Sequence, residues 1–188
     1  MNDVKGLVVN LLGGCDISSM TAEDFGGNIS LNLYKPQNSR IRDQENFDKL
    51  PDIIKDIILI IDFDTELNIN GILGFLENST GLYLDETIKT LKRIEAYEDC
   101  EILENIQKIM LKHGVSTKYL TNNLKNVNHY DITSFSKTHG SDYDIMANEI
   151  GLAAEGLYLY QDERNIFTNL LKYIDINKNT IVEYLKDI

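Results

Sequence analysis

The chain has 188 residues, 43% of them hydrophobic, which is enough for one compact domain with a continuous core. Thirty acidic against eighteen basic residues give a formal net charge of −12, which opposes direct binding to nucleic acid or an anionic membrane and favours a basic protein partner. Cys15 and Cys100 are isolated thiols, so the cysteines predict neither a disulfide framework nor a zinc site and fit a reducing cytoplasm.

The first predicted helix lies at residues 4–12, where apolar side chains recur three and four positions apart before a Gly-Gly pair. The segment 12–15 is similar to a bacterial lipoprotein cleavage box. Asn10 interrupts the apolar run that a secretory signal needs, which favours a chain that stays in the cytoplasm. No segment reaches the roughly 20 apolar residues of a membrane span.

The next segments are less regular. Residues 28–34 alternate between polar and apolar side chains, which fits a short strand, and the polar stretch 35–46 predicts one surface loop. Pro51 stands where a first-turn proline belongs. The run 53–61 is apolar nearly all round, which predicts a central helix covered on most sides.

Two helical pairs are predicted in the second half of the chain. Residues 84–94 and 102–110 carry apolar stripes typical of an antiparallel pair, and residues 146–160 and 166–174 carry stripes typical of a second pair. Residues 180–185 fit either helix or strand. The chain is therefore predicted to be all-α, a compact bundle of antiparallel helical pairs in a single domain, with 28–34 as a candidate short strand or hairpin.

Three groups of side chains carry the residue types that sites of chemistry need. The carboxylates within 62–66 fan out over about 200° on a helix and cannot grip one ion, and 175–186 lacks the glycine and glutamate of a calcium loop. His139 stands close to Asp142 and Asp144, which fits a general base, although loop composition explains it equally well. We therefore predict no metal, no cofactor and no catalytic residue.

Acidic residues gather in the stretches 45–66, 95–104 and 141–163. Asp52 and Asp56 lie one helical turn apart, about 6 Å along the axis, which is close to the spacing of successive phosphates on a nucleic-acid strand. Such rows could imitate a phosphate backbone, although any solvated helix face carries charge runs as well. The residues predicted to contact a basic partner are Asp48, Asp52, Asp56, Asp142, Asp144, Glu149 and Glu155.

A glycine-containing motif spans residues 66–81, and an amphipathic stretch follows it at 82–94. Residues 60–110 resemble a bacterial family of small acidic helical proteins that includes a DNA-mimic protein. The family motif reads approximately Glu-x-x-Asn-Gly-Gly-Phe-x-Gln-Tyr-Phe-x-Asn-Ser-Ser-Gly. The matching positions are Glu66, Gly71, Phe75, Asn78, Ser79 and Gly81, whereas Ile69, Asn70 and Gly74 depart from it.

The matched residues predict a scaffold rather than an active site. Gly71 and Gly81 can relax backbone sterics, Asn78 and Ser79 can cap or turn the chain, and Glu66 can hydrogen-bond the bend between helices.

The resemblance implies a homodimer and a non-enzymatic, acidic protein-binding module that occupies the basic face of a DNA-binding regulator. An immunity or antitoxin protein that neutralises a basic toxin would use the same complementarity. An enzyme with an unrecognised site is the third hypothesis.

Overall fold

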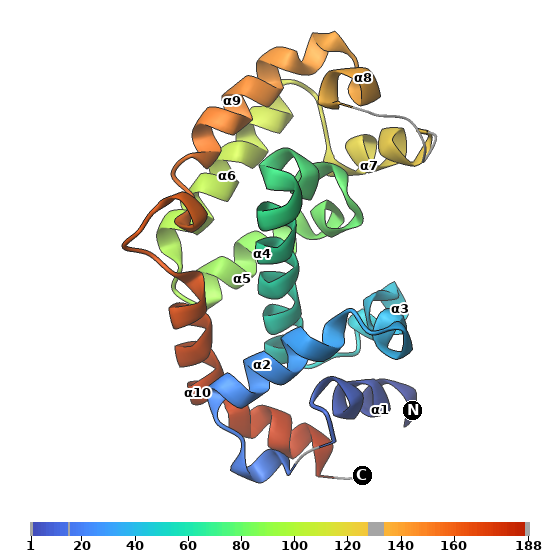
Figure 1. The fold of residues 1–188 in the computed structure, drawn as a ribbon, viewed down its shortest axis with the longest axis vertical. Helices are drawn as coiled ribbons and strands as arrows, with labels where there is room; N and C mark the ends of the chain where they lie inside the picture. The colour runs from blue at the N-terminus through green and yellow to red at the C-terminus, as the bar shows by residue number, and fades with distance from the viewer. Residues whose placement is uncertain (1, 15, 128–133, 187–188) are drawn as a thin grey trace. The chain divides into compact units, whose positions relative to one another are not determined.

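The computed structural model describes residues 2–14, 16–127 and 134–186 (Figure 1). These ranges contain helices and no strand, which confirms the all-α prediction. The chain falls into two compact units, one formed by Met1–Ile61 and Phe167–Ile188 and the other by Asp62–Ile166.

The first unit begins with α1 (Asn2–Leu11) and α2 (Ala22–Leu33), which pack against each other. Thr21 starts α2 through a reciprocal capping box: its hydroxyl accepts from the Asp24 N–H at 3.2 Å, and the Asp24 carboxylate accepts from the Thr21 N–H at 2.9 Å. The prediction of a strand at 28–34 is therefore wrong. On a strand, alternate residues share a face, but Ile29 is buried whereas Leu31 is 74% exposed, as a helix requires.

The polar stretch that follows is more ordered than a simple surface loop. It forms the 3-10 segment η2 (Pro36–Arg42) and the short helix α3 (Gln44–Phe47). Asn38 is fully buried, and its amide donates to the carbonyl of Asn32 at 2.9 Å. Ile41 is buried as well, so this segment closes part of the core of the first unit.

Helix α4 (Asp52–Glu77) begins directly after Pro51 and contributes residues 52–61 to the first unit. The isoleucines between 53 and 61 are all buried, which confirms the predicted central helix. Helix α10 (Ile166–Leu185) completes this unit and includes the ambiguous segment 180–185. Because 175–179 lies inside α10, it is helical and does not form a loop of the calcium-binding kind.

The second unit contains the rest of α4 and four longer helices. They are α5 (Leu84–Arg93), α6 (Tyr97–Lys112), α7 (Thr117–Lys125) and α9 (Asp144–Ala154), with the short α8 (Phe135–His139) between the last two. Helices α5 and α6 run antiparallel, as predicted. The start of α5 bonds to the end of α6 through Asp85 and Gln107, and the Cys100 thiol lies 3.5 Å from the Ile88 carbonyl oxygen.

The predicted partner of the last acidic helix differs in the structure. Helix α9 packs against α6 and ends at Ala154, so Leu157 and Tyr160 lie beyond it, whereas residues 167–185 of α10 belong to the other unit. The 3.6-residue periodicity identifies the buried face of α9, including Met146 and Ile150, but does not say which helix covers that face.

Candidate functional site

The matched motif surrounds a break in α4. Gly71 has φ 68° and ψ −176°, which interrupts the helix five residues after Glu66. The Glu66 carboxylate accepts hydrogen bonds from the side-chain amides of Asn70, at 2.8 Å, and of Asn78, at 2.7 Å. One side chain thus ties the helix before the break to the turn after it, which confirms the predicted hydrogen bond at the bend.

The remaining motif residues build the core and a close backbone approach. A Cβ atom at Gly81 would lie 2.5 Å from the carbonyl oxygens of Phe75 and Leu76, which is too close for any side chain. The buried ring of Phe75 meets the ring of Phe63 edge to face at a centroid distance of 5.0 Å. These contacts support the prediction that the motif is a scaffold.

The acidic residues predicted as a contact row in the first unit do not form one. Asp48 and Asp52 are exposed; Asp48 accepts from the Gln44 amide at 2.8 Å, and Asp52 lies 3.5 Å from the Lys55 ammonium. Asp56 is 0% exposed, and its carboxylate accepts from the Tyr173 hydroxyl at 2.8 Å. The assignment of Asp56 to a contact surface is therefore wrong, because the isoleucine-rich face of α4 carries it into the core.

The acidic residues predicted in the second unit separate into two kinds. Asp142 and Glu155 are exposed. Asp144 accepts from the Ser136 hydroxyl, and Glu149 accepts from the Lys112 ammonium at 2.9 Å. These bonds stabilise the packing of the helices that carry them.

Glu149 has a second partner, since Nε2 of His113 lies 3.1 Å from its other carboxylate oxygen. The hydrogen bonds from Lys112 and then from His113 lower the pKa of Glu149 below its usual value. Glu149 therefore links α9 to the end of α6 more than it offers charge to a partner.

The structure brings together two acidic stretches that are far apart in the sequence. Arg164 places its guanidinium 2.9 Å from the Glu98 carboxylate and 3.7 Å from that of Asp99, and the Tyr158 N–H donates to Asp99 at 2.7 Å. The loop that follows α9 is thereby held against the first turn of α6. We call the exposed carboxylates of these two segments the acidic end; they are Glu95, Glu98, Glu101, Glu155, Asp162 and Glu163.

The sequence shows both acidic stretches but does not show that they lie side by side. The one signal was Arg164, the first basic residue after the run 141–163, which has none. A guanidinium placed next to an acidic run is often paired, yet spacing alone does not identify Glu98 as its partner. The contact depends on tertiary packing.

The net charge is unevenly distributed between the two units. Residues 62–166 hold nine of the eighteen basic residues but eighteen of the thirty acidic ones, so their formal charge is −9 against −3 for the rest of the chain. The second unit therefore dominates the electrostatic field that an approaching partner meets.

A buried hydrogen-bonded group underlies the acidic end. Asp99 is 3% exposed, and burial raises its pKa above the usual range, although the Tyr158 N–H and Arg164 act in the opposite direction. The Tyr158 hydroxyl donates to Asp64 at 2.6 Å, and burial raises the pKa of this hydroxyl as well. Asp64 and Glu66 thus have different partners, as expected for carboxylates that fan out on a helix.

The histidine considered as a general base is part of the packing instead. The ring of His139 is buried, with Nε2 2.8 Å from the Glu77 carboxylate and Nδ1 3.3 Å from the Asn123 amide. Its nearest charged partner therefore comes from α4 rather than from Asp142 or Asp144. His129 and Cys15 lie outside the described residues.

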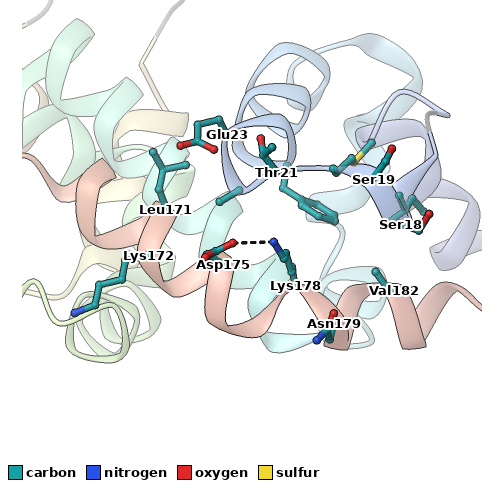
Figure 2. A pocket seen from close by; sticks show the side chains of 14 residues that line it. Ser18, Ser19, Thr21, Glu23, Leu171, Lys172, Asp175, Lys178, Asn179 and Val182 are labelled. Atoms are coloured by element: carbon teal, nitrogen blue, oxygen red, sulfur yellow. Dashed lines mark hydrogen bonds and ion pairs between the residues drawn. The ribbon is translucent and has the colours of Figure 1, made fainter.

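A cavity of 590 Å³ lies in the first unit between the start of α2 and the middle of α10 (Figure 2). The Lys178 ammonium points to Asp175 at 2.8 Å, as the dashed line in Figure 2 shows, and the Thr21 hydroxyl donates to Asp24 at 2.9 Å. Ser18 donates to Asp16 at 2.7 Å. Of the polar groups that line this cavity, Ser18 and Thr21 thus take part in helix capping, and Asp175 and Lys178 form one ion pair.

Among the described residues, no group of three or more His, Cys, Asp or Glu side chains is placed to hold a metal ion. No helix in the same part of the chain is long and apolar enough to cross a membrane.

Comparison with known proteins identifies one family. The profile described as DMP19-like protein matches residues 48–177, which is more than two thirds of the chain and includes the motif, the break in α4 and the acidic end. The chain matched no curated protein and no solved structure.

Proposed function

Because the chain belongs to the DMP19-like family, we propose that it is a non-enzymatic DNA mimic that occupies the basic face of a DNA-binding protein. The family name abbreviates DNA mimic protein 19. Membership supports the class of function, whereas the partner and the contact surface have to be argued from this chain, because function depends on the surface that a fold carries.

The acidic end is the observation that carries the proposal. It gathers six exposed carboxylates from two segments, and the basic group among them, Arg164, is paired with Glu98 and Asp99. A partner that binds DNA through Lys and Arg would meet at this surface a cluster of negative charge that such a basic face attracts.

The exposed positions in the structure place the proposed contact surface on residues other than those predicted from the sequence. Of the residues first selected, Glu155 and Asp142 stay exposed in the second unit, whereas Asp56 is buried and Asp144 and Glu149 hold the helices together. We propose that Glu98, Glu101, Asp162 and Glu163 act with Glu155 in their place. A bacterial cytoplasmic location and a homodimer complete the proposal, and light scattering tests the homodimer.

A competition experiment tests the proposed function. The immobilised protein is exposed to a lysate of its source organism and eluted first with duplex DNA and then with high salt. Release of a DNA-binding protein by duplex DNA would support mimicry, since both ligands compete for one basic face. Release of a basic toxin by salt alone would instead support neutralisation of a toxin.

Charge-neutral variants locate the surface. A variant with Glu98, Glu101, Glu155 and Glu163 changed to glutamine should lose the DNA-releasable partner. A matched variant with four exposed acidic residues of the first unit changed to their amides, Glu23, Glu45, Asp175 and Glu183, should retain it. Equal retention by both variants would contradict the assignment to the acidic end.

A further inference from the structure

A groove of 320 Å³ lies in the second unit next to the break in α4. Residues 70–73 form one wall, at and just after the break. Gly151, Ala154 and Glu155 of the α9 region form the other wall together with Tyr160. Its volume is near the lower end of the roughly 300–1,000 Å³ typical of ligand pockets, so it suits one large side chain better than a cofactor.

The groove exists because small residues face it. Gly151 lies within helix α9, and no heavy atom lies within 4 Å of the position that its Cβ would take. Tyr160 is 54% exposed although its ring is large and apolar. An exposed aromatic ring beside an open apolar groove is a surface that a partner can bury.

One carboxylate lines this groove, and two more follow closely in the sequence. Glu155 is the one charged residue among its described lining residues, and it also belongs to the acidic end. Asp162 and Glu163 follow Tyr160 by two and three positions and are exposed. An occupant therefore meets apolar walls and a field of one sign.

We propose that this groove binds a large aromatic or aliphatic side chain from a basic segment of the partner protein, with the Lys and Arg residues of that segment facing the acidic end. The inference rests on the proposed function and supplies the anchor that the acidic surface lacks. Apolar walls select the anchor, and the carboxylates of the acidic end select its basic neighbours.

Physical reasoning gives the two parts of this site different roles. Attraction between exposed charges falls off over about 8 Å at physiological ionic strength and orients a partner weakly. A buried aromatic anchor contributes binding energy that salt does not screen, and such anchors dominate many interfaces. Orientation and residence time would therefore depend on the groove, and the rate of encounter on the acidic end.

Gly151→Leu is the variant that tests the groove. Gly151 lines the groove, and no heavy atom lies within 4 Å of the position that its Cβ would take, so a leucine at this position is expected to occupy space in the groove. Gly151→Ala is the matched control, because it makes the same backbone change and leaves most of the groove open. Circular dichroism and thermal unfolding establish that both variants are folded.

Two labelled peptides serve as probes. One has a central tryptophan flanked by three lysines on each side, and the other has serine in place of the tryptophan. We expect the wild-type protein and Gly151→Ala to bind the tryptophan peptide about tenfold more tightly in fluorescence anisotropy, which corresponds to about 1.4 kcal/mol. Gly151→Leu should abolish this preference and leave the affinity for the serine peptide unchanged.

The outcomes separate this inference from the proposed function. Equal affinity of the wild type for both peptides, or a preference for tryptophan that persists in Gly151→Leu, would contradict the proposal that the groove binds an anchor side chain. Conversion of a dimer to a monomer by Gly151→Leu in light scattering would also overturn it, since a second copy would then be the occupant. The variant with four glutamines should bind both peptides more weakly. If its affinity for both peptides is unchanged while Gly151→Leu abolishes the preference for tryptophan, the proposed groove site is supported and the proposed DNA mimicry is contradicted.

Discussion

Gly71 adopts φ 68° and ψ −176°, a backbone conformation that is essentially restricted to glycine. The Cβ of an alanine would meet no heavy atom within 4 Å there, so the cost of Gly71→Ala would be backbone strain alone. We expect Gly71→Ala to lower the free energy of unfolding by about 2 kcal/mol, measured by urea denaturation. The control Gly151→Ala should raise it by up to about 1 kcal/mol, because alanine favours a helix. An unchanged midpoint for Gly71→Ala would show that the break does not require this conformation.

Glu95 is the one non-glycine residue with positive φ among the described residues, at 64°. It follows the end of α5, where the Ala96 N–H donates to the Leu91 carbonyl at 2.9 Å and the Glu95 N–H to the Lys92 carbonyl at 3.2 Å. Glycine usually occupies this position of a helix C-terminus. Glu95→Gly is therefore expected to raise the free energy of unfolding by about 1 kcal/mol in the same measurement. A lower midpoint would mean that the contacts of the Glu95 side chain outweigh its backbone strain.

At the scale of elements, the loop after α9 is attached to two helices through one tyrosine. The Tyr158 hydroxyl bonds to Asp64 of α4, and its N–H bonds to Asp99 of α6. Tyr158→Phe removes the hydroxyl and leaves a half-buried carboxylate without this donor, so we expect a loss of about 1–2 kcal/mol in the free energy of unfolding. Tyr160→Phe, at an exposed position, should change it by less than about 0.5 kcal/mol. Similar losses for both variants would indicate that the hydroxyl bond does not matter.

The contact between this loop and α6 should also depend on pH. Burial raises the pKa of Asp99 above its ordinary value of 3.8, so the folded protein holds a proton that the unfolded chain has already released. The stability that this proton contributes is fully present below about pH 3.8 and is lost as the pH rises through the folded pKa.

Asp99→Asn keeps an acceptor for the Tyr158 N–H but does not titrate. Relative to the wild type, the variant should therefore gain free energy of unfolding as the pH rises from about 3.8 through the raised pKa of Asp99, as measured by denaturation at each pH. A difference that stays constant with pH would contradict this origin.

The sequence predicted where helices form better than it predicted which helices pack against each other. Apolar periodicity located α1, α5 and α6 because each buries one continuous face, whereas α4 was located by an apolar run that is covered on most sides. It failed at α2, where an alternating run happened to coincide with a capped helix, and it could not show that α9 packs on α6. The sequence also could not predict that Asp56 is buried. A carboxylate in an apolar helix is expected to lie at the surface unless a buried donor is known, and here the Tyr173 hydroxyl is that donor.

At the scale of the whole molecule, composition predicted the sign of the charge but not its location. The formal charge of −9 on the second unit predicts steered association with a basic ligand. We expect the association rate of the lysine peptides, measured by stopped flow, to fall at least tenfold between about 0.05 M and about 0.5 M salt, since screening shortens the reach of the field. The preference for tryptophan over serine should persist across that range. An association rate independent of salt would contradict steering.

The division of the chain also bears on how the protein folds as it is synthesised. Residues 62–166 emerge from the ribosome as one uninterrupted stretch, whereas the first unit needs both its early helices and α10. At the usual rate of about 5–20 residues per second, α1 and α2 therefore wait for about 7–30 seconds before the helix that completes their core is made. The charged unit can fold during that interval, while the apolar faces of the early helices remain open to chaperones.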